Sequence, residues 1–207
     1  MGKYFGTDGY RGEANVDLTA DTAFKVGKFL AYYFSNKGTK ECRIVIGKDT
    51  RRSSYMFEYA LSAGITAAGA DAYLMHVTTT PSVSYIVRSE DFSCGVMISA
   101  SHNEFSDNGI KFFAEGGVKL DDATELAIEA ELEKEMLTKP SEQLGRARRI
   151  DGADARYIEF CKSTFPGQFD LRGLKLVVDT ANGAGYGVAP KVFHELGGEV
   201  VSIGDEP

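Results

Sequence analysis

Short apolar runs alternate along the chain with longer segments that carry apolar residues at helical spacing. Runs of this length predict buried strands, and the longer segments predict helices. The predicted strands of the first part are 43–47, 72–77, 94–100 and 110–113. The predicted helices are 19–37, 55–68, 81–88 and a charged helix from about 121 to 137. Strands that alternate with helices over short connections indicate an α/β domain with a mostly parallel sheet.

Polar residues mark where several of these elements begin and end. Thr19 is placed to cap the first helix, and Gly38 to end it. Ser53 or Ser54 is the predicted cap of helix 55–68. His76 falls within a strand pattern, so we interpret it as a core or face residue rather than a ligand.

A polar, locally basic segment at 139–150 predicts an irregular linker or domain edge. A second unit follows, with helices predicted at 153–164 and 186–196 and strands at 174–179 and 199–203. The predicted domains are 1–150 and 151–207, and the second is small for a self-sufficient α/β domain. The predicted fold class is therefore a three-layer α/β/α domain with a mixed, mostly parallel sheet, followed by an incomplete second α/β domain of similar type.

Composition narrows the class of protein. Hydrophobic residues make up 43% of the 207 residues and charged residues 26%, which is typical of chains with real cores. The net charge of -7 argues against nucleic acid as a partner, because such proteins carry a basic stripe. No apolar stretch is long enough to span a bilayer and no signal peptide is evident, so we expect a cytoplasmic protein without a membrane partner. The three cysteines are widely spaced and are expected to be reduced, structural thiols.

Candidate chemistry follows the strand 94–100. Ligands of α/β folds bind beyond the carboxyl ends of strands, and here the chain reads Ser99-Ala-Ser101-His102-Asn103, with a turn predicted at 107–109. Ser101 is a candidate nucleophile beside His102, with Lys111 nearby. The alternative is a polar loop that satisfies its own backbone. A serine hydrolase is disfavoured, because no Gly-x-Ser-x-Gly surrounds the serine.

Two other segments carry candidate binding residues. The glycines around Thr7, Asp8 and Arg11 indicate a backbone that turns tightly or approaches a ligand. Arg51 and its cationic neighbours lie near the end of the strand 43–47. Taken separately, the first segment also fits a flexible turn, and the second a solvated charge run.

Taken in order, these motifs resemble the α-D-phosphohexomutase family. They are Gly6-Thr-Asp-Gly-x-Arg-Gly12, Gly47-x-Asp-Thr-Arg51, and Ser99-Ala-Ser-His-Asn103 with Asp107-Asn-Gly-x-Lys111. The resemblance covers the first domain throughout and the visible part of the second. It implies a phosphosugar mutase that isomerises a phosphorylated hexosamine through a bound 1,6-bisphosphate.

The resemblance also implies roles for individual residues. Ser101 would be the phosphorylated catalytic serine. The other implied catalytic residues are Arg11, His102 and Lys111. The implied substrate- or phosphate-binding residues are Thr7, Asp8, Gly9, Asn103 and Arg51. The implied cofactors are Mg²⁺, bound here only through the phosphate on Ser101, and a hexose 1,6-bisphosphate activator. The resemblance also allows a homodimer.

Two departures from the family pattern bear on activity. The family has proline after Ser-His-Asn, where this chain has Glu104, which leaves the loop less rigid. The family's Asp-rich magnesium loop, sugar-selecting loop and C-terminal phosphate-binding domain are not found before Pro207. We therefore expect a fragment of a longer enzyme, inactive alone. The open alternatives are phosphomannomutase or phosphoglucomutase specificity, and a non-catalytic phosphosugar-binding module.

Overall fold

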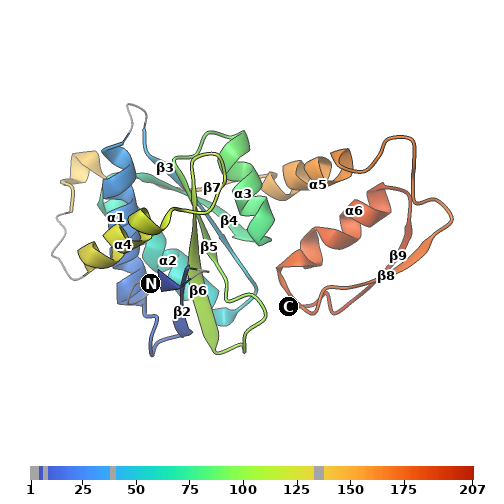
Figure 1. Cartoon of the computed structure of the whole chain (residues 1–207), viewed down its shortest axis with the longest axis horizontal. Helices are drawn as coiled ribbons and strands as arrows, with labels where there is room; N and C mark the ends of the chain where they lie inside the picture. The colour runs from blue at the N-terminus through green and yellow to red at the C-terminus, as the bar shows by residue number, and fades with distance from the viewer. Residues whose placement is uncertain (1–4, 7–8, 38–40, 133–137) are drawn as a thin grey trace.

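The computed structural model describes residues 5–6, 9–37, 41–132 and 138–207. Its larger sheet has seven strands in the order β1-β2-β6-β5-β3-β4-β7 (Figure 1). These strands are β1 (Phe5–Gly6), β2 (Gly9–Glu13), β3 (Arg43–Lys48), β4 (Asp71–Val77), β5 (Cys94–Ile98), β6 (Asp107–Ala114) and β7 (Ala147–Arg149). The predicted sequence positions of β3, β4 and β5 are confirmed within two residues at each end.

The sheet is mixed, as predicted. Strands β5, β3, β4 and β7 pair in parallel, whereas β5, β6, β2 and β1 pair antiparallel. Parallel pairings are thus confined to one half of the sheet, fewer than the alternation of strands and helices predicts. The reason is that β6 returns directly from β5 without a crossover helix, and two strands that follow each other in this way must run antiparallel.

Helices cover both faces of the large sheet and give three layers. On one face lie α1 (Ala20–Ser35), α2 (Arg52–Ala67) and α4 (Asp122–Leu132). On the other lie α3 (Thr80–Ser89) and α5 (Ala153–Ser163) (Figure 1). The predicted cap of the first helix is confirmed, because the Thr19 hydroxyl accepts from the Thr22 amide at 3.2 Å. Among the described helices, none is long and apolar enough to cross a membrane.

The backbones of α1 and α2 touch at two glycines. A Cβ placed on Gly64 would lie 2.1 Å from the Phe24 carbonyl oxygen of α1, and one on Gly27 would lie 2.4 Å from the Leu61 carbonyl oxygen of α2. Both distances are far below van der Waals contact, and neither partner is a flexible side chain. The two helices can therefore pack this closely only because glycine has no Cβ at these two positions.

Replacing Gly64 with alanine should destabilise the protein, although alanine is favoured over glycine by about 1 kcal/mol inside a helix. The methyl group would force the helices apart, and overpacking of this kind costs about 1–3 kcal/mol. Chemical denaturation measures the change. Gly185→Ala is the matched control, since a Cβ there meets no atom within 4 Å. An unchanged or raised stability of Gly64→Ala would contradict the close contact.

Three local predictions are wrong. The turn at 107–109 is instead the beginning of β6, and Asn108 is fully buried with its amide bonded to the hydroxyls of Ser53 and Ser54. Helix α2 begins at Arg52, and no side chain caps it. The segment 139–150 contains β7, which extends the sheet beside β4. These segments are short or polar, so they lack the apolar runs from which strands and helices are predicted.

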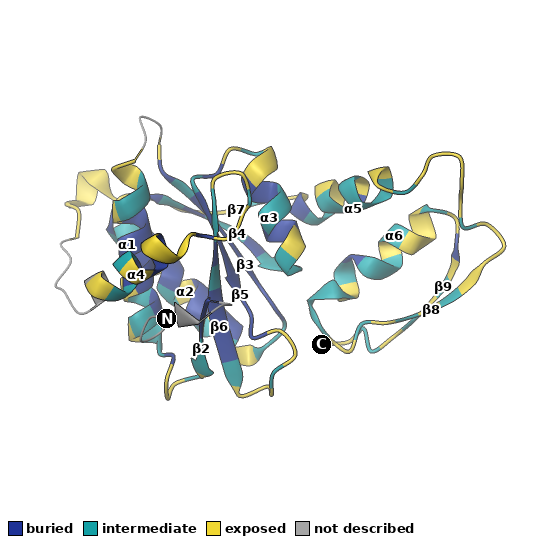
Figure 2. Ribbon diagram, in the orientation of Figure 1, coloured by how far each residue is buried: buried dark blue, intermediate teal, exposed yellow. Residues whose placement is uncertain are grey.

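The second unit has a parallel pair of strands, β8 (Lys175–Asp179) and β9 (Glu199–Ile203), with α6 (Ala189–Glu195) between them in sequence. The side chains of β8 and β9 alternate between half-buried and exposed positions, so one face of this small sheet is open (Figure 2). Helix α5 contacts the first unit through the rings of Phe160 and Tyr85, which stack with centroids 4.4 Å apart. The domain limits at residue 150 stay a prediction.

The thiols fit the structural role that their spacing predicts. All three cysteines are unpaired, and Cys42 and Cys94 are buried. Burial raises the pKa of the Cys94 thiol well above its ordinary value and raises that of Cys42 less strongly. A raised pKa disfavours the thiolate, which is the nucleophilic form.

Candidate functional site

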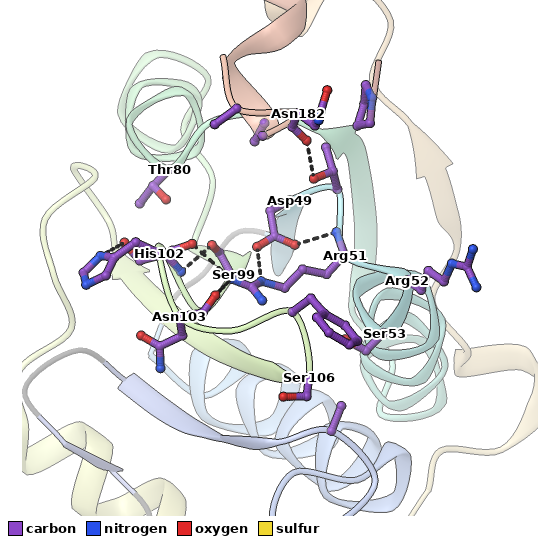
Figure 3. Close-up of a pocket in the computed structure, with 18 of the residues that line it drawn as sticks. Asp49, Arg51, Arg52, Ser53, Thr80, Ser99, His102, Asn103, Ser106 and Asn182 are labelled. Carbon is purple, nitrogen blue, oxygen red and sulfur yellow. Dashed lines mark hydrogen bonds and ion pairs between the residues drawn. The ribbon is translucent and has the colours of Figure 1, made fainter. Parts of the chain in front are cut away.

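The carboxyl ends of β3, β4 and β5 meet at one edge of the large sheet, and a cavity of about 1210 Å³ opens there (Figure 3). Three chain segments contribute most of its wall. They are residues 49–53 after β3, residues 99–106 after β5, and residues 181–184 of the second unit. The Thr50 hydroxyl donates to the Asn182 carbonyl at 2.9 Å, which joins the first and third segments.

Ser101 stands at the turn of the loop between β5 and β6 and is exposed to this cavity. Its φ of 58° lies in the left-handed region, which a non-glycine residue adopts only when its surroundings hold it there. Part of that support is local, because the Ser101 amide donates to the hydroxyl of buried Ser99 at 3.0 Å. This conformation turns the chain sharply at Ser101, so the Ser101 hydroxyl lies outside the sheet.

His102 is the immediate neighbour of that hydroxyl. Its Nδ1 lies 3.3 Å from Ser101 Oγ, and both side chains are exposed. An imidazole nitrogen at this distance can accept the hydroxyl proton in the tautomer that carries its hydrogen on Nε2. The structure thus places the Ser101 and His102 side chains within hydrogen-bond distance of each other. Their catalytic roles stay predictions.

Arg51 reaches from the end of β3 into the Ser101 loop. Its Nη2 donates to the carbonyls of Ser101, at 3.0 Å, and Asn103, at 2.9 Å. Its Nη1 donates to the carbonyls of Glu104 and, at 3.1 Å, of Asp107. The predicted role of Arg51 as a phosphate ligand stays a prediction, and the contacts seen here are with the protein itself.

The Asp49 carboxylate holds both the backbone and the guanidinium of Arg51. Asp49 Oδ2 accepts from Arg51 Nε at 3.0 Å, while Asp49 Oδ1 accepts from the Arg51 amide and from the Ser54 hydroxyl at 2.6 Å. Ser54 in turn accepts from the buried amide of Asn108 on β6. These hydrogen bonds join the segment directly after β3 to α2 and β6.

From the sequence, neither Asp49 nor Asn108 was predicted to belong to the site, and Ser54 was predicted only as a helix cap. Asp49 stands in the Gly-x-Asp-Thr-Arg motif, directly after a buried strand, and that position was the available signal. Nothing comparable marks Asn108, because a buried asparagine in a strand looks like a turn residue in the sequence.

Asn103 lines the same cavity as Ser101, whereas Gly9 and Lys111 do not. Asn103 donates from Nδ2 to Asp107 at 3.0 Å, within the loop. Gly9 and Lys111 line a smaller cavity of about 230 Å³, and Thr80 lines both cavities.

Arg11 pairs with Gly109 across β2 and β6. Gly9 needs to be glycine, because its φ is 85° and a Cβ would lie 2.3 Å from the Ile110 carbonyl oxygen. Thr7 and Asp8 lie outside the described residues.

The described residues do not form a magnesium site by themselves. Within 5–6, 9–37, 41–132 and 138–207, no group of three or more His, Cys, Asp or Glu side chains could hold a metal ion. Magnesium prefers several oxygen ligands, and a phosphate on Ser101 would supply only some of them. The Mg²⁺ cofactor stays a prediction from the family resemblance.

Comparison with known proteins gives one family match. The family described as phosphoglucomutase/phosphomannomutase, alpha/beta/alpha domain I, matches residues 2–139.

Curated relatives carry the name phosphoglucosamine mutase. The one from Neisseria gonorrhoeae is 63% identical over 207 residues, covering 99% of this chain and 47% of the relative. The one from Ralstonia nicotianae is 54% identical over 210 residues, covering 99% and 47%. The chain thus spans about half the length of the curated relatives it matches.

Two solved structures share the fold. A phosphoglucomutase/phosphomannomutase family protein from Burkholderia thailandensis has a TM-score of 0.81 and 25% identity, covering 98% of this chain and 44% of that protein. A candidate phosphomannomutase from Thermus thermophilus has a TM-score of 0.84 and 27% identity, covering 98% and 46%.

Proposed function

Because the chain belongs to the phosphoglucomutase/phosphomannomutase family, we propose that it carries the nucleophile of a phosphosugar mutase. The observation that carries the proposal is Ser101, held in a left-handed corner at the carboxyl edge of the sheet with its hydroxyl 3.3 Å from His102 Nδ1. The proposed reaction interconverts glucosamine 6-phosphate and glucosamine 1-phosphate. Relatives named phosphoglucosamine mutase, at 54–63% identity, support that substrate.

The proposed reaction transfers a phosphoryl group twice. Phosphorylated Ser101 gives its phosphoryl group to the free hydroxyl of the sugar phosphate, so that the bond from phosphorus to Ser101 Oγ breaks and a bond to the sugar oxygen forms. The sugar hydroxyl loses its proton to a base, Ser101 Oγ takes up a proton as it leaves, and the product is a 1,6-bisphosphate. After this intermediate reorients in the site, the Ser101 hydroxyl loses its proton and attacks the other phosphoryl group. The bond from that phosphorus to the sugar oxygen breaks, and the sugar oxygen gains a proton.

The chain's own residues would supply protons and counter-charge. Serine is a weak nucleophile at neutral pH and needs a base, and His102 lies within reach of its hydroxyl. A phosphoserine carries about -1.5 to -2 charges, for which Arg11 and Lys111 are the proposed counter-charges. Mg²⁺, when bound, would neutralise phosphate charge further. The enzyme would act in the cytoplasm, in the synthesis of amino-sugar nucleotides and cell-wall precursors.

Phosphopeptide mass spectrometry across residues 99–111 tests the proposal. The complete polypeptide that the reading frame encodes is measured as isolated and after incubation with glucosamine 1,6-bisphosphate and Mg²⁺. We expect phosphate on Ser101 alone. Turnover with Ser101 unmodified would overturn the phosphoserine, and the absence of both phosphate and turnover would favour a non-catalytic phosphosugar-binding module.

The second candidate function is phosphomannomutase activity. The candidate phosphomannomutase from Thermus thermophilus shares the fold with a TM-score of 0.84, although only 27% of residues are identical. Both activities would use the same Ser101 chemistry, so phosphorylation does not separate them. Initial rates with glucosamine 1-phosphate and mannose 1-phosphate do, and a higher kcat/KM for mannose 1-phosphate would replace the first assignment.

A further inference from the structure

We propose that Arg51 is a positioning residue that holds Ser101 in its reactive corner, not a ligand of the substrate phosphate. The inference rests on the proposed function, because Ser101 is the group that it positions. It starts from the contacts of the guanidinium group, which are directed entirely at the protein.

The hydrogen-bonding capacity of Arg51 is used up. A guanidinium has five N–H donors in a fixed plane and no acceptor. The acceptors present are the Asp49 carboxylate and the carbonyls of Ser101, Asn103, Glu104 and Asp107, one for each donor. A phosphate could bond to Arg51 only by displacing one of them.

The Arg51 side chain itself is also sheltered from water. The Arg51 side chain is 11% exposed and its partner Asp49 is 10% exposed. Hydrogen bonds from a charged donor are about twice as strong as neutral ones and gain further where water is excluded. Asp49 is itself held by Ser54, so the plane of the guanidinium is set from β3 and α2.

The bonds fall where the backbone needs support. Ser101 has a left-handed φ, a conformation that costs a non-glycine residue energy unless its surroundings hold it there. Arg51 binds the carbonyl of Ser101 itself and three further carbonyls on the following six residues. The loop therefore wraps around one cation, which fixes the peptide plane next to the hydroxyl that reacts.

Lysine cannot reproduce this arrangement. Its ammonium is a point charge with three donors, so Arg51→Lys keeps the charge but leaves at least two acceptors without a partner. Arg52→Lys is the matched control. Arg52 is exposed, directly follows Arg51, and points away from the loop (Figure 3).

Hydrogen–deuterium exchange tests the positioning without relying on activity. The complete polypeptide, Arg51→Lys and Arg52→Lys are compared over residues 99–111, where the amides of Ser101, Asn103 and Asp107 are bonded within the loop. We expect exchange at these amides to rise about tenfold or more in Arg51→Lys and to stay unchanged in Arg52→Lys. Unchanged exchange in Arg51→Lys would overturn the proposal. The melting temperature, measured in parallel, separates loosening of the loop from global unfolding.

Steady-state kinetics separates positioning from phosphate binding. Misplacing a reactive group costs on the order of 10²-fold in kcat, so Arg51→Lys should lose kcat at nearly constant KM for glucosamine 1-phosphate. A raised KM with kcat retained would identify Arg51 as a phosphate ligand and overturn the proposal. If the parent protein shows neither turnover nor phosphate on Ser101, the proposed function fails, and the exchange experiment still decides whether Arg51 holds the loop.

Discussion

Replacing Ser101 with glycine is expected to abolish mutase turnover while leaving the protein as stable as before, or more stable. Loss of a nucleophile typically costs on the order of 10⁴-fold or more in kcat. Glycine adopts a positive φ without steric penalty, so the substitution relieves the strain at 58°. The gain is at most ~1 kcal/mol, because glycine also makes the unfolded chain more flexible. Turnover of glucosamine 1-phosphate and chemical denaturation measure the two effects.

Opposite changes in activity and stability would show that Ser101 is kept for chemistry. Ser101→Ala also removes the nucleophile but keeps the strained φ, so it should lose turnover equally without gaining stability. Ser163→Ala is the control serine, because its hydroxyl donates to the Phe160 carbonyl of its own helix. Retention of more than about a tenth of kcat in both Ser101 variants would exclude Ser101 as the nucleophile.

Breaking the buried ion pair between Lys48 and Glu58 should cost more stability than any surface change. Lys48 Nζ donates to Glu58 Oε2, and the two side chains are 1% and 0% exposed. Lys48 Nζ also lies 4.2 Å from the centre of the Tyr55 ring and 3.4 Å from His76 Nδ1. Glu58→Leu would leave the ammonium buried without its carboxylate, and such losses cost about 3–5 kcal/mol. The free energy of unfolding from a denaturant titration gives the value.

The double variant Lys48→Met/Glu58→Leu should recover most of that loss, because an apolar pair of similar volume avoids the desolvation of two charges. The contrasting pair is Lys175 and Glu199, whose side chains are 65% and 69% exposed at an N–O distance of 3.0 Å. Glu199→Gln should change stability by less than about 1 kcal/mol. A loss of that small size in Glu58→Leu would mean that the ion pair is not buried in solution.

Most of the first unit could be predicted from the sequence because its strands and helices have strong signals. The run 43–47 is apolar and short, and Thr19 stands directly before an apolar periodicity, so β3 and the beginning of α1 were predictable. Strand β7 was not, since its three residues are exposed at the edge of the sheet and carry no apolar pattern. An edge strand forms through hydrogen bonds to the backbone of its neighbour, and no particular residue type is needed for these bonds.

The site shows the same division. Ser101 and His102 were predictable because small polar residues at the end of a buried strand are typical of ligand sites. The partners of Arg51 were not, since four of its five acceptors are backbone carbonyls. Every residue has a backbone carbonyl. A contact with one does not depend on which amino acid provides it, so it cannot be predicted from the sequence.

The saturated guanidinium of Arg51 withholds two properties that an arginine beside a cavity usually supplies. Its charge is paired with the Asp49 carboxylate, 3.0 Å from Nε, so an anion that enters the cavity gains little net attraction from it. Its directional bonds are already made within the protein, so they cannot choose the angle at which that anion comes to rest. Both attraction and orientation in this cavity must therefore come from other groups.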